Sequence, residues 1–223
     1  MKTRIIAFLG ALMLGGCLSI NSDIEVADGK TIDGGLNTIN GSVRIGNRSV
    51  VEGSVKTVNG SVTAGNASKI AGSIETVNGK IALERDVQAE SARTVNGSIA
   101  IGEGARLADG AETVNGQIVV AADARVEDTV SSVNGQIRIQ GGTVGALKNS
   151  EGGIVVEQDS RVLGELRIVR ARDSRRDKPL MVEIHAGAEV IGPLIFERDV
   201  RLRIHETATV GEIQGAEPEY FDD

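Results

Sequence analysis

The feature that most constrains this chain is a tetrapeptide that returns at almost fixed intervals. TING occupies residues 38–41, TVNG returns four times, and SVNG ends the series at 132–135. Successive asparagines are 18 or 19 residues apart. A fixed short period is typical of proteins that stack one structural unit on the next. The asparagines that mark the period are Asn40, Asn59, Asn78, Asn96, Asn115 and Asn134.

Apolar residues keep the same period. The phase set by the first apolar residue after each Asn-Gly pair extends before the first copy and beyond the last. Within each segment the apolar residues alternate, as in Val43/Ile45 and Ile99/Ile101, and the spacing of an amphipathic helix is absent. The pattern predicts short strands that recur in ten segments, whose first apolar residues are Ile24, Val43, Val62, Ile81, Ile99, Ile118, Ile137, Ile154, Val182 and Leu202.

Asn-Gly between apolar residues also favours a β-hairpin, so an antiparallel meander is the alternative. A two-residue hairpin would place Val58 opposite polar Ser61, and the same mismatch would recur in every copy. If the chain turns a corner and continues to coil, Val58 and Val62 can both point inward. The sequence therefore predicts an all-β fold over 24–214, a single-stranded parallel β-helix. This three-sided β-solenoid would have about ten coils of about 19 residues, stacked about 4.8 Å apart.

Stacking of like residues has consequences for the corners. The six asparagines are expected to form a ladder of side-chain amides, and the threonines before them, such as Thr57, a second ladder through their hydroxyls. Gly60 and its equivalents would supply a corner conformation that is costly for other residues. A narrow interior also suits a chain with only 2% aromatic residues.

The first residues, MKTRIIAFLGALMLGGC, have the features of an export signal. A positive end precedes an apolar stretch over 5–14 that is too short to span a bilayer as a helix. The ending Leu14-Gly15-Gly16-Cys17 resembles the lipobox of bacterial lipoproteins, whose cysteine carries a diacylglycerol on its thiol and an acyl chain such as palmitate on its amino group. The resemblance implies a signal peptide over 1–16 and lipid attachment at Cys17. The alternative is an ordinary signal peptide followed by a buried cysteine.

The lipobox resemblance also implies a location. Residues 17–23 would form a short lipidated linker, and Leu18 after the cysteine, in place of Asp, indicates the outer rather than the inner membrane of a bacterial envelope. Loss of the leader removes Lys2 and Arg4 and no acid, so the formal net charge changes from −7 to −9. Such an acidic body would be repelled by nucleic acid. The expected partners are the membrane, through the lipid, and an envelope protein or an anionic glycan.

Short steps of the form [VI]-x-G-x-[VIL] recur between the asparagine corners, for example over 51–55 and 70–74. With coils of near-constant length, they resemble the bactofilins, bacterial proteins that form a β-helix and polymerise end to end without nucleotide. The TVNG rows also look like repeats of uncharacterised exported bacterial β-helix proteins. Bactofilins are mainly cytoplasmic and lack a lipobox, so the resemblance implies the stacking geometry and not the cytoskeletal role.

Few residues outside the repeat carry candidate chemistry. One coil is longer than the others and contains the basic segment 170–179, which predicts a solvated loop or a contact for an anionic partner such as lipopolysaccharide phosphate. His185 and His205 would lie in adjacent coils as exposed corner residues or, as a weaker alternative, as ligands of a divalent metal. No Ser-His-Asp order, phosphate loop or HExxH motif is present, so no catalytic residue, cofactor or metal is assigned. The basic residues of the segment are Arg170, Arg172, Arg175, Arg176 and Lys178.

A solenoid leaves an unpaired strand edge at each end, which needs a cap or invites another molecule. The acidic tail 215–223 is expected to serve as a cap, with Tyr220 and Phe221 over the last core layer. The chain is then expected to be a monomeric, non-enzymatic, lipid-anchored envelope protein whose rigid rod is a scaffold or an interaction surface. One alternative is a bactofilin-like polymer assembled end to end. Another is a protein that binds or acts on polysaccharide through the basic segment.

Overall fold

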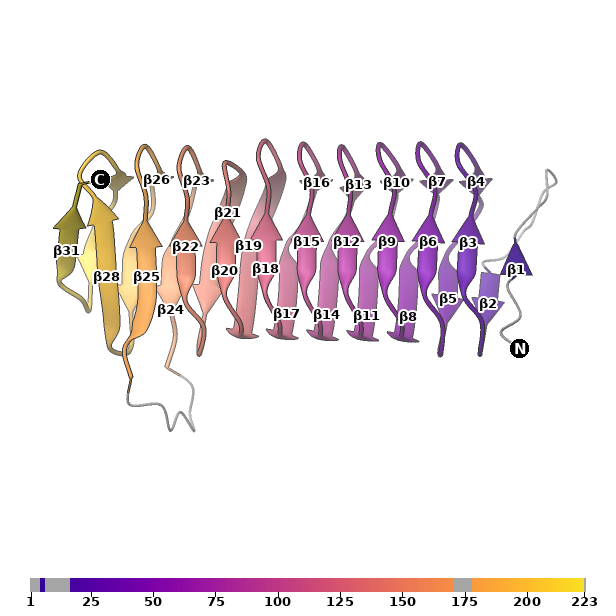
Figure 1. The fold of residues 1–223 in the computed structure, drawn as a ribbon, viewed down its shortest axis with the longest axis horizontal. Coiled ribbons are helices and arrows are strands. Elements are labelled where there is room, and N and C mark those ends of the chain that lie inside the picture. The colour runs from indigo at the N-terminus through magenta and orange to yellow at the C-terminus, as the bar shows by residue number, and fades with distance from the viewer. Residues whose placement is uncertain (1–4, 7–16, 171–177, 223) are drawn as a thin grey trace.

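The chain forms a long rod of stacked β-strands (Figure 1). The structure is a computed structural model and describes residues 5–6, 17–170 and 178–222. Over these residues every regular element is a strand, and the strands pair in parallel with their equivalents in the next coil. The fold is therefore a parallel β-solenoid of about ten turns, as the repeat predicted.

The rod has three faces, of which the first is a 12-stranded sheet. Its strands carry the apolar pairs that follow the Asn-Gly corners, and it faces the viewer in Figure 1. In order along the rod they are β1 (Ile5–Ile6), β3 (Ile24–Val26), β6 (Val43–Ile45), β9 (Val62–Ala64), β12 (Ile81–Leu83), β15 (Ile99–Ile101), β18 (Ile118–Val120), β20 (Ile137–Ile139), β22 (Ile154–Val156), β25 (Leu180–Ile184), β28 (Val200–His205) and β31 (Pro218–Phe221).

The second and third faces together form a 19-stranded sheet. They are joined where β19 (Arg125–Asn134) and β21 (Thr143–Asn149) run from one face onto the other without interruption, with a register shift between Val126 and Thr129. The second face also contains β2 (Cys17–Ser19), β5 (Leu36–Thr38), β8 (Val55–Asn59), β11 (Ile74–Asn78), β14 (Ala92–Asn96), β17 (Ala111–Asn115), β24 (Leu166–Ile168), β27 (Leu194–Phe196) and β30 (Ile213–Gln214). The third contains β4 (Thr31–Ile32), β7 (Val50–Val51), β10 (Lys69–Ile70), β13 (Gln88–Ala89), β16 (Arg106–Leu107), β23 (Arg161–Val162), β26 (Glu189–Val190) and β29 (Thr209–Val210).

The core is a continuous column of aliphatic side chains from all three faces. The three-residue strands of the first face bury their first and third residues, as Val62 and Ala64 do in β9, and in most of them the middle residue is half-buried or exposed. Each buried residue stacks on its equivalent, so that Val43 pairs with Val62 and Val62 with Ile81. One aromatic ring, Phe196, enters the column near its C-terminal end, where it replaces the smaller residues found earlier in the stack.

One predicted orientation is wrong. Val58 does not point inward: its side chain is 39% exposed, whereas the adjacent Thr57 is only 4% exposed. The reason is that β8 continues through Asn59, so the alternation that starts with buried Val55 places Thr57 inside and Val58 outside. Val77, Val95, Val114 and Val133 are exposed in the same way.

The buried threonines do not form a ladder with one another, as had been expected. The hydroxyl of Thr57 donates to the carbonyl oxygen of Gly41 (2.9 Å), and that of Thr76 to the carbonyl oxygen of Gly60 (2.9 Å). Each hydroxyl thus bonds to the glycine carbonyl of the preceding corner. A buried hydroxyl with a partner is tolerated in a core, which explains why a polar residue takes the inward position.

The glycines of the tetrapeptide are required for space rather than for an unusual backbone angle. Gly60 and its equivalents are not among the residues with positive φ, contrary to the expected corner conformation. A Cβ atom built on Gly79 would overlap the carbonyl oxygen of Gly60 in the coil below, and Gly97, Gly116 and Gly135 meet the same obstacle. Positive φ occurs at another corner, at Arg48, Ala67 and equivalent positions.

Stacking extends beyond 24–214 at both ends. The backbone of β2 pairs with β5, so residues 17–19 of the expected linker continue the second face. The backbone of Ile5–Ile6 pairs with β3. At the C-terminus β31 adds a strand to the first face instead of folding over the core, and Tyr220 is 63% exposed. The other residues of 1–16 lie outside the described part of the chain.

Candidate interaction surface

The second face carries a groove between two outward rows of side chains, which we call the valine groove. Strands β8, β11, β14, β17 and β19 each contribute one residue to an apolar row and one, two positions earlier, to a polar row. In the first coil the polar residue lies in β5 and the apolar residue directly follows this strand. Inward threonines lie between the rows and form the floor. The apolar row consists of Ile39, Val58, Val77, Val95, Val114 and Val133, and the polar row of Asn37, Lys56, Glu75, Arg93, Glu112 and Ser131.

The polar row alternates in charge from coil to coil. Lys56 Nζ lies 3.1 Å from Glu75 Oε2, and Arg93 Nε lies 3.4 Å from Glu112 Oε2. The hydroxyl of Ser73 donates to Oε1 of Glu75 (2.8 Å). This hydrogen bond, followed by Lys56, holds the pKa of Glu75 below its usual value of 4.5, although partial burial acts in the opposite direction. With two basic and two acidic residues, the polar row has no net formal charge.

The asparagine ladder follows the apolar row, one position later in the chain. Asn59 donates through Nδ2 to Oδ1 of Asn40 (2.8 Å), and Asn78 donates in the same way to Asn59 (2.8 Å). The remaining bonds, from Asn96, Asn115 and Asn134 to the preceding asparagine, measure 2.9 to 3.0 Å. Asn21, which has no TxNG motif, begins the ladder by accepting from Asn40 (2.8 Å). The side-chain amides of successive coils are therefore joined by a continuous row of hydrogen bonds along the rod.

A second, shorter ladder at another corner was not predicted. Asn47 donates through Nδ2 to Oδ2 of Asp28 (3.1 Å), and Asn66 donates to Oδ1 of Asn47 (3.1 Å). The hydrogen bonds from the side chain and backbone of Asn47 lower the pKa of Asp28. The only sequence signal for this ladder is the recurrence of Asp or Asn at the coil period.

The valine groove ends where the repeat changes. Asn149 replaces the inward threonine, is fully buried, and donates through Nδ2 to the carbonyl oxygen of Gly135 (2.7 Å). Beyond it, Glu151 forms an ion pair with Arg198 (3.0 Å) in which the side chains are 11% and 8% exposed. Later coils place Ile168 and Phe196 at the threonine position.

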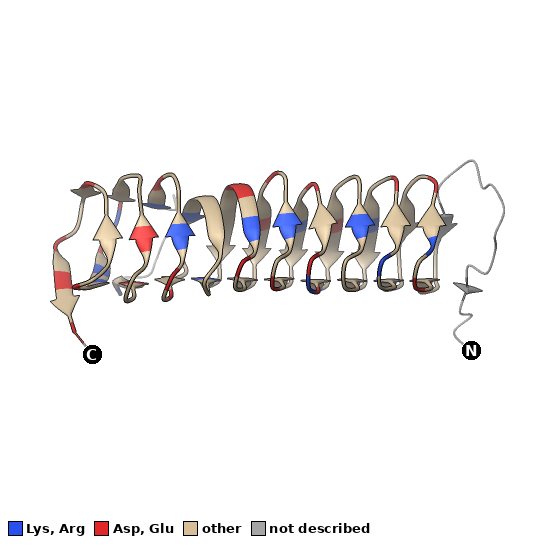
Figure 2. Ribbon diagram, turned by 90° about the horizontal axis from the view of Figure 1, so that it is seen from above, with Lys and Arg blue, Asp and Glu red and all other residues tan. Residues whose placement is uncertain are grey.

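Figure 2 looks down on the third face, where basic residues recur in several strands. The row contains Lys69, Arg106, Arg125 and Arg161 in register, with Gln88 and Thr143 between them. Arg125 Nε lies 2.6 Å from Glu127 Oε1, and Arg161 Nη2 lies 2.6 Å from Glu189 Oε2. The positive charge of this row is therefore partly neutralised by acidic residues of the same chain.

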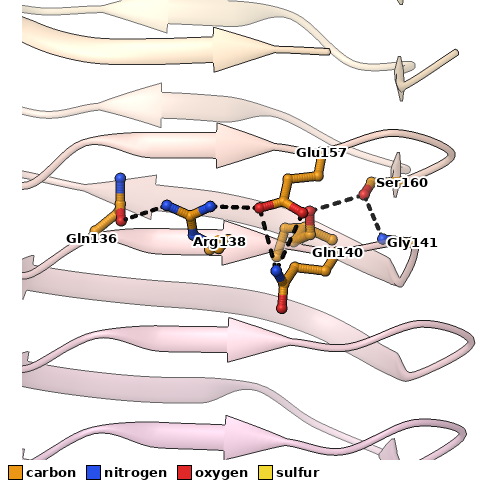
Figure 3. Close-up of polar contacts among 7 residues, drawn as sticks. Gln136, Arg138, Gln140, Gly141, Glu157 and Ser160 are labelled. Carbon is orange, nitrogen blue, oxygen red and sulfur yellow. Dashed lines mark hydrogen bonds and ion pairs between the residues drawn. The ribbon is translucent and has the colours of Figure 1, made fainter. Parts of the chain in front are cut away.

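A polar network connects neighbouring coils on the first face (Figure 3). Glu157 accepts hydrogen bonds from Arg138 (2.5 Å) and from Gln140 (3.2 and 3.3 Å), and Arg138 also donates to Gln136 (3.2 Å). Nearby, the hydroxyl of Ser160 accepts a hydrogen bond from the backbone N–H of Gly141 (2.9 Å) and donates one to the carbonyl oxygen of Ile139 (3.0 Å). These bonds hold the coil that begins with β22 against the coil that begins with β20.

The two histidines do lie in adjacent coils, and both contact the ring of Phe221. The ring centroids are 6.0 Å from His185 and 5.2 Å from His205, with edge-to-face geometry, and the Arg203 guanidinium lies 4.5 Å from the Phe221 centroid. His205 is 9% exposed, not the exposed corner residue expected, and its Nδ1 lies 2.9 Å from Thr207 Oγ1. Across the described residues, no group of three or more His, Cys, Asp or Glu side chains is placed to hold a metal ion.

The remaining predicted site residues are only partly visible. Arg172, Arg175 and Arg176 lie within 171–177, outside the described residues. Arg170 donates its backbone N–H to Glu197 (3.3 Å), and Lys178 is exposed. The backbone of Cys17 begins β2, at the N-terminal end of the second face.

Sequence reasoning missed the valine groove because it assigned the valines to the core. Counting alternate positions forward from Val55 would have found the outward row, since Val55 and Thr57 then share the inner side.

Comparisons with known proteins return no match: no family model, no curated protein sequence and no solved structure is similar to this chain. No helix among the described residues has the length and apolar character needed to cross a membrane.

Proposed function

We propose that this chain is a non-enzymatic, lipid-anchored protein of the bacterial cell envelope whose rigid β-solenoid presents an interaction surface. The observation that carries the proposal is the valine groove, an exposed apolar row that continues through six coils of an otherwise charged rod. Contiguous apolar surface bordered by polar residues marks interaction sites in soluble proteins. A stack in which the coils are joined by backbone hydrogen bonds keeps such a surface straight.

The anchor is argued from the lipobox-like sequence and from the position of Cys17. Its backbone lies at the N-terminal end of the rod, so acyl chains at this residue would place the first coil against the bilayer. Two or three acyl chains exceed what stable anchoring needs, since each buried CH₂ contributes about 0.8 kcal/mol. The outer membrane is the expected location.

The anchor is tested by Cys17→Ser in the full chain. We expect the parent protein to incorporate labelled palmitate and to fractionate with the outer membrane, and the variant to lose both properties while keeping its β-sheet circular dichroism. Leu18→Ser serves as a control that leaves the thiol in place and should retain the label. Membrane association of the variant equal to that of the parent would contradict lipid attachment.

The interaction surface is tested by capture of envelope components from solubilised membranes. Val77→Glu places a charge in the middle of the valine groove, whereas Gln88→Glu makes the same charge on the third face. Both positions are exposed, so neither change should unfold the rod. Capture that is lost with the first variant and kept with the second supports the proposal, and capture unaffected by both contradicts it.

A second candidate, end-to-end assembly as in bactofilins, is favoured by the N-terminal edge. The backbone of Ile5–Ile6 pairs with β3, so this edge can accept a further parallel strand, and cleavage before Cys17 would leave it open. Filaments in electron micrographs of the delipidated protein, growing longer with concentration, would support this assembly. Single rods at all concentrations would exclude it.

A further inference from the structure

The polar row of the valine groove reverses its charges about its own centre. In successive coils the row reads Asn37, Lys56, Glu75, Arg93, Glu112 and Ser131. Its centre lies between Glu75 and Arg93. Lys56 and Glu112 are equally far from this centre and have opposite charges, as do Glu75 and Arg93 on either side of it. The two end residues are neutral.

The apolar row has the same centre. Ile39, Val58 and Val77 lie on one side of it, and Val95, Val114 and Val133 lie on the other. Their exposures are nearly uniform, from 38% to 43%, so the row is even along its length. A single two-fold rotation about this centre therefore exchanges the two halves of each row. In the polar row it exchanges each charged residue with one of opposite charge.

We propose that the valine groove binds a second copy of this chain, with the two rods antiparallel. A two-fold axis in the plane of the face, perpendicular to the rod and passing between the coils of Glu75 and Arg93, reverses the rod but keeps each row opposite its counterpart. Lys56 then faces Glu112 of the second copy, and Glu75 faces Arg93. The valines face one another in the adjoining row. Such an interface is isologous and self-complementary.

The charges select both the direction and the register of this dimer. A parallel dimer needs a two-fold axis along the rod, which reverses the strand direction. The polar row then faces the apolar row or, if the axis lies over the polar row, Lys56 faces Lys56 and Glu75 faces Glu75. In an antiparallel arrangement shifted by one coil, Lys56 would face Arg93 and Glu75 would face its own counterpart. Each alternative places like charges together or places charged groups against valines, which disfavours it relative to the centred register. The aliphatic row supplies the apolar contact that all antiparallel registers share.

The size of the groove predicts a weak dimer. Six coils at about 4.8 Å extend over about 29 Å, which is short for an interface of standard area. We therefore expect association in the micromolar range or weaker. The dimer deepens the proposed function, because it names the partner of the proposed surface, and it departs from the monomer expected from the sequence. It depends on the groove and not on the lipid.

Cysteine cross-linking tests the arrangement directly, in the full chain with Cys17→Ser, in excess non-ionic detergent. Val58 and Val114 lie three coils apart, about 14 Å, too far for an intramolecular disulfide. In the centred antiparallel dimer Val58 faces Val114 of the second copy. We expect Val58→Cys combined with Val114→Cys to give a covalent dimer on mild oxidation, and each single variant to give no covalent dimer. Equal cross-linking by the single variants, or none by the pair, would overturn the proposal.

Charge reversal tests the register by sedimentation equilibrium. Lys56→Glu places two glutamates opposite each other, and we expect it to raise the dimer dissociation constant at least tenfold. Adding Glu112→Lys restores opposite charges across the interface, so the double variant should regain near-parent affinity. The double variant breaks two ion pairs within each chain, so a purely intramolecular effect would make it worse than either single variant.

Lys69→Glu, the same charge change on the third face, is the matched control and should leave association unchanged. A chain that is monomeric at all concentrations would end the dimer proposal but leave the anchored rod intact. Conversely, a Cys17→Ser protein that dimerises but remains at the membrane would contradict the anchor and leave the dimer intact.

Discussion

At the residue scale, the buried threonines show how this narrow core accommodates a polar group. Thr76 is 4% exposed, and its hydroxyl has a carbonyl partner in the preceding coil. Because the bond runs from one coil to the next, it fixes the height of the corner as well as satisfying the hydroxyl. The adjacent Val77 supplies apolar surface outside the core instead.

This assignment predicts unequal effects of two neighbouring substitutions. Thr76→Val keeps the volume but removes the hydroxyl, and should lower the free energy of unfolding by about 1 kcal/mol. Val77→Ser should change it by less than about 0.5 kcal/mol, because the side chain is exposed. Urea unfolding followed by circular dichroism gives both values. A larger cost for Val77→Ser would mean that the valine, and not the threonine, faces the core.

Glu75 predicts a pH effect on the same face. Its pKa is lowered on folding, chiefly by the Ser73 hydroxyl, so the ionised carboxylate stabilises the folded state above pH 4.5. This stabilisation is lost as the pH falls through the lowered pKa. Ser73→Ala should move the pKa of Glu75 upward, as measured by NMR titration of the carboxyl carbon, and make the stability lost on acidification smaller. Ser61→Ala, at a corner without Glu75, should leave the titration unchanged.

At the element scale, the asparagine ladder joins strands that backbone pairing already holds in register. An interior member such as Asn78 makes two ladder bonds, to Asn59 (2.8 Å) and from Asn96 (2.9 Å), whereas Asn134, the last member, bonds to Asn115 (3.0 Å). The ladder is exposed, so each bond competes with water. Its value should depend on position within the row.

Alanine substitution measures this dependence. We expect Asn78→Ala to lower the free energy of unfolding by about 1 kcal/mol and Asn134→Ala by about half as much, because one bond is lost instead of two. Thermal unfolding of the two variants side by side gives the comparison. Identical costs would show that the amides act singly and not as a ladder.

The period was sufficient to predict the strands, their parallel pairing and the asparagine ladder, because a stack forces like residues onto like. The phase of the first-face strands was predicted as well, but that of the second-face strands was predicted wrongly, since reading backward from Asn-Gly placed Val58 instead of Thr57 in the interior. The hydroxyl bond of Thr57 decides between them, and its acceptor, the carbonyl oxygen of Gly41, is visible only once the coils are superposed. The Glu151–Arg198 pair, from segments distant in sequence, has no periodic signal at all.

At the scale of the whole molecule, the rod is close to one-dimensional, because each coil contacts its two neighbours and little else. Stability in such arrays is a sum of coil and interface contributions, and a lesion at one interface can uncouple the coils on either side. The tetrapeptide glycines lie at these interfaces, where the backbones approach most closely. They are therefore the positions at which the continuity of the rod can be tested.

Gly79→Ala should break this continuity. Its Cβ would overlap the Gly60 carbonyl, and neither backbone can move without disturbing its neighbours, so we expect a loss of about 3 kcal/mol. Hydrogen exchange should show the greatest loss of protection in β8, β11 and β12, with the coils from β20 to β28 nearly unchanged. Gly29→Ala, where the added Cβ meets no atom but φ is +67°, should affect only the first coils. Uniform loss of protection along the rod in Gly79→Ala would show instead that the solenoid unfolds as one cooperative unit.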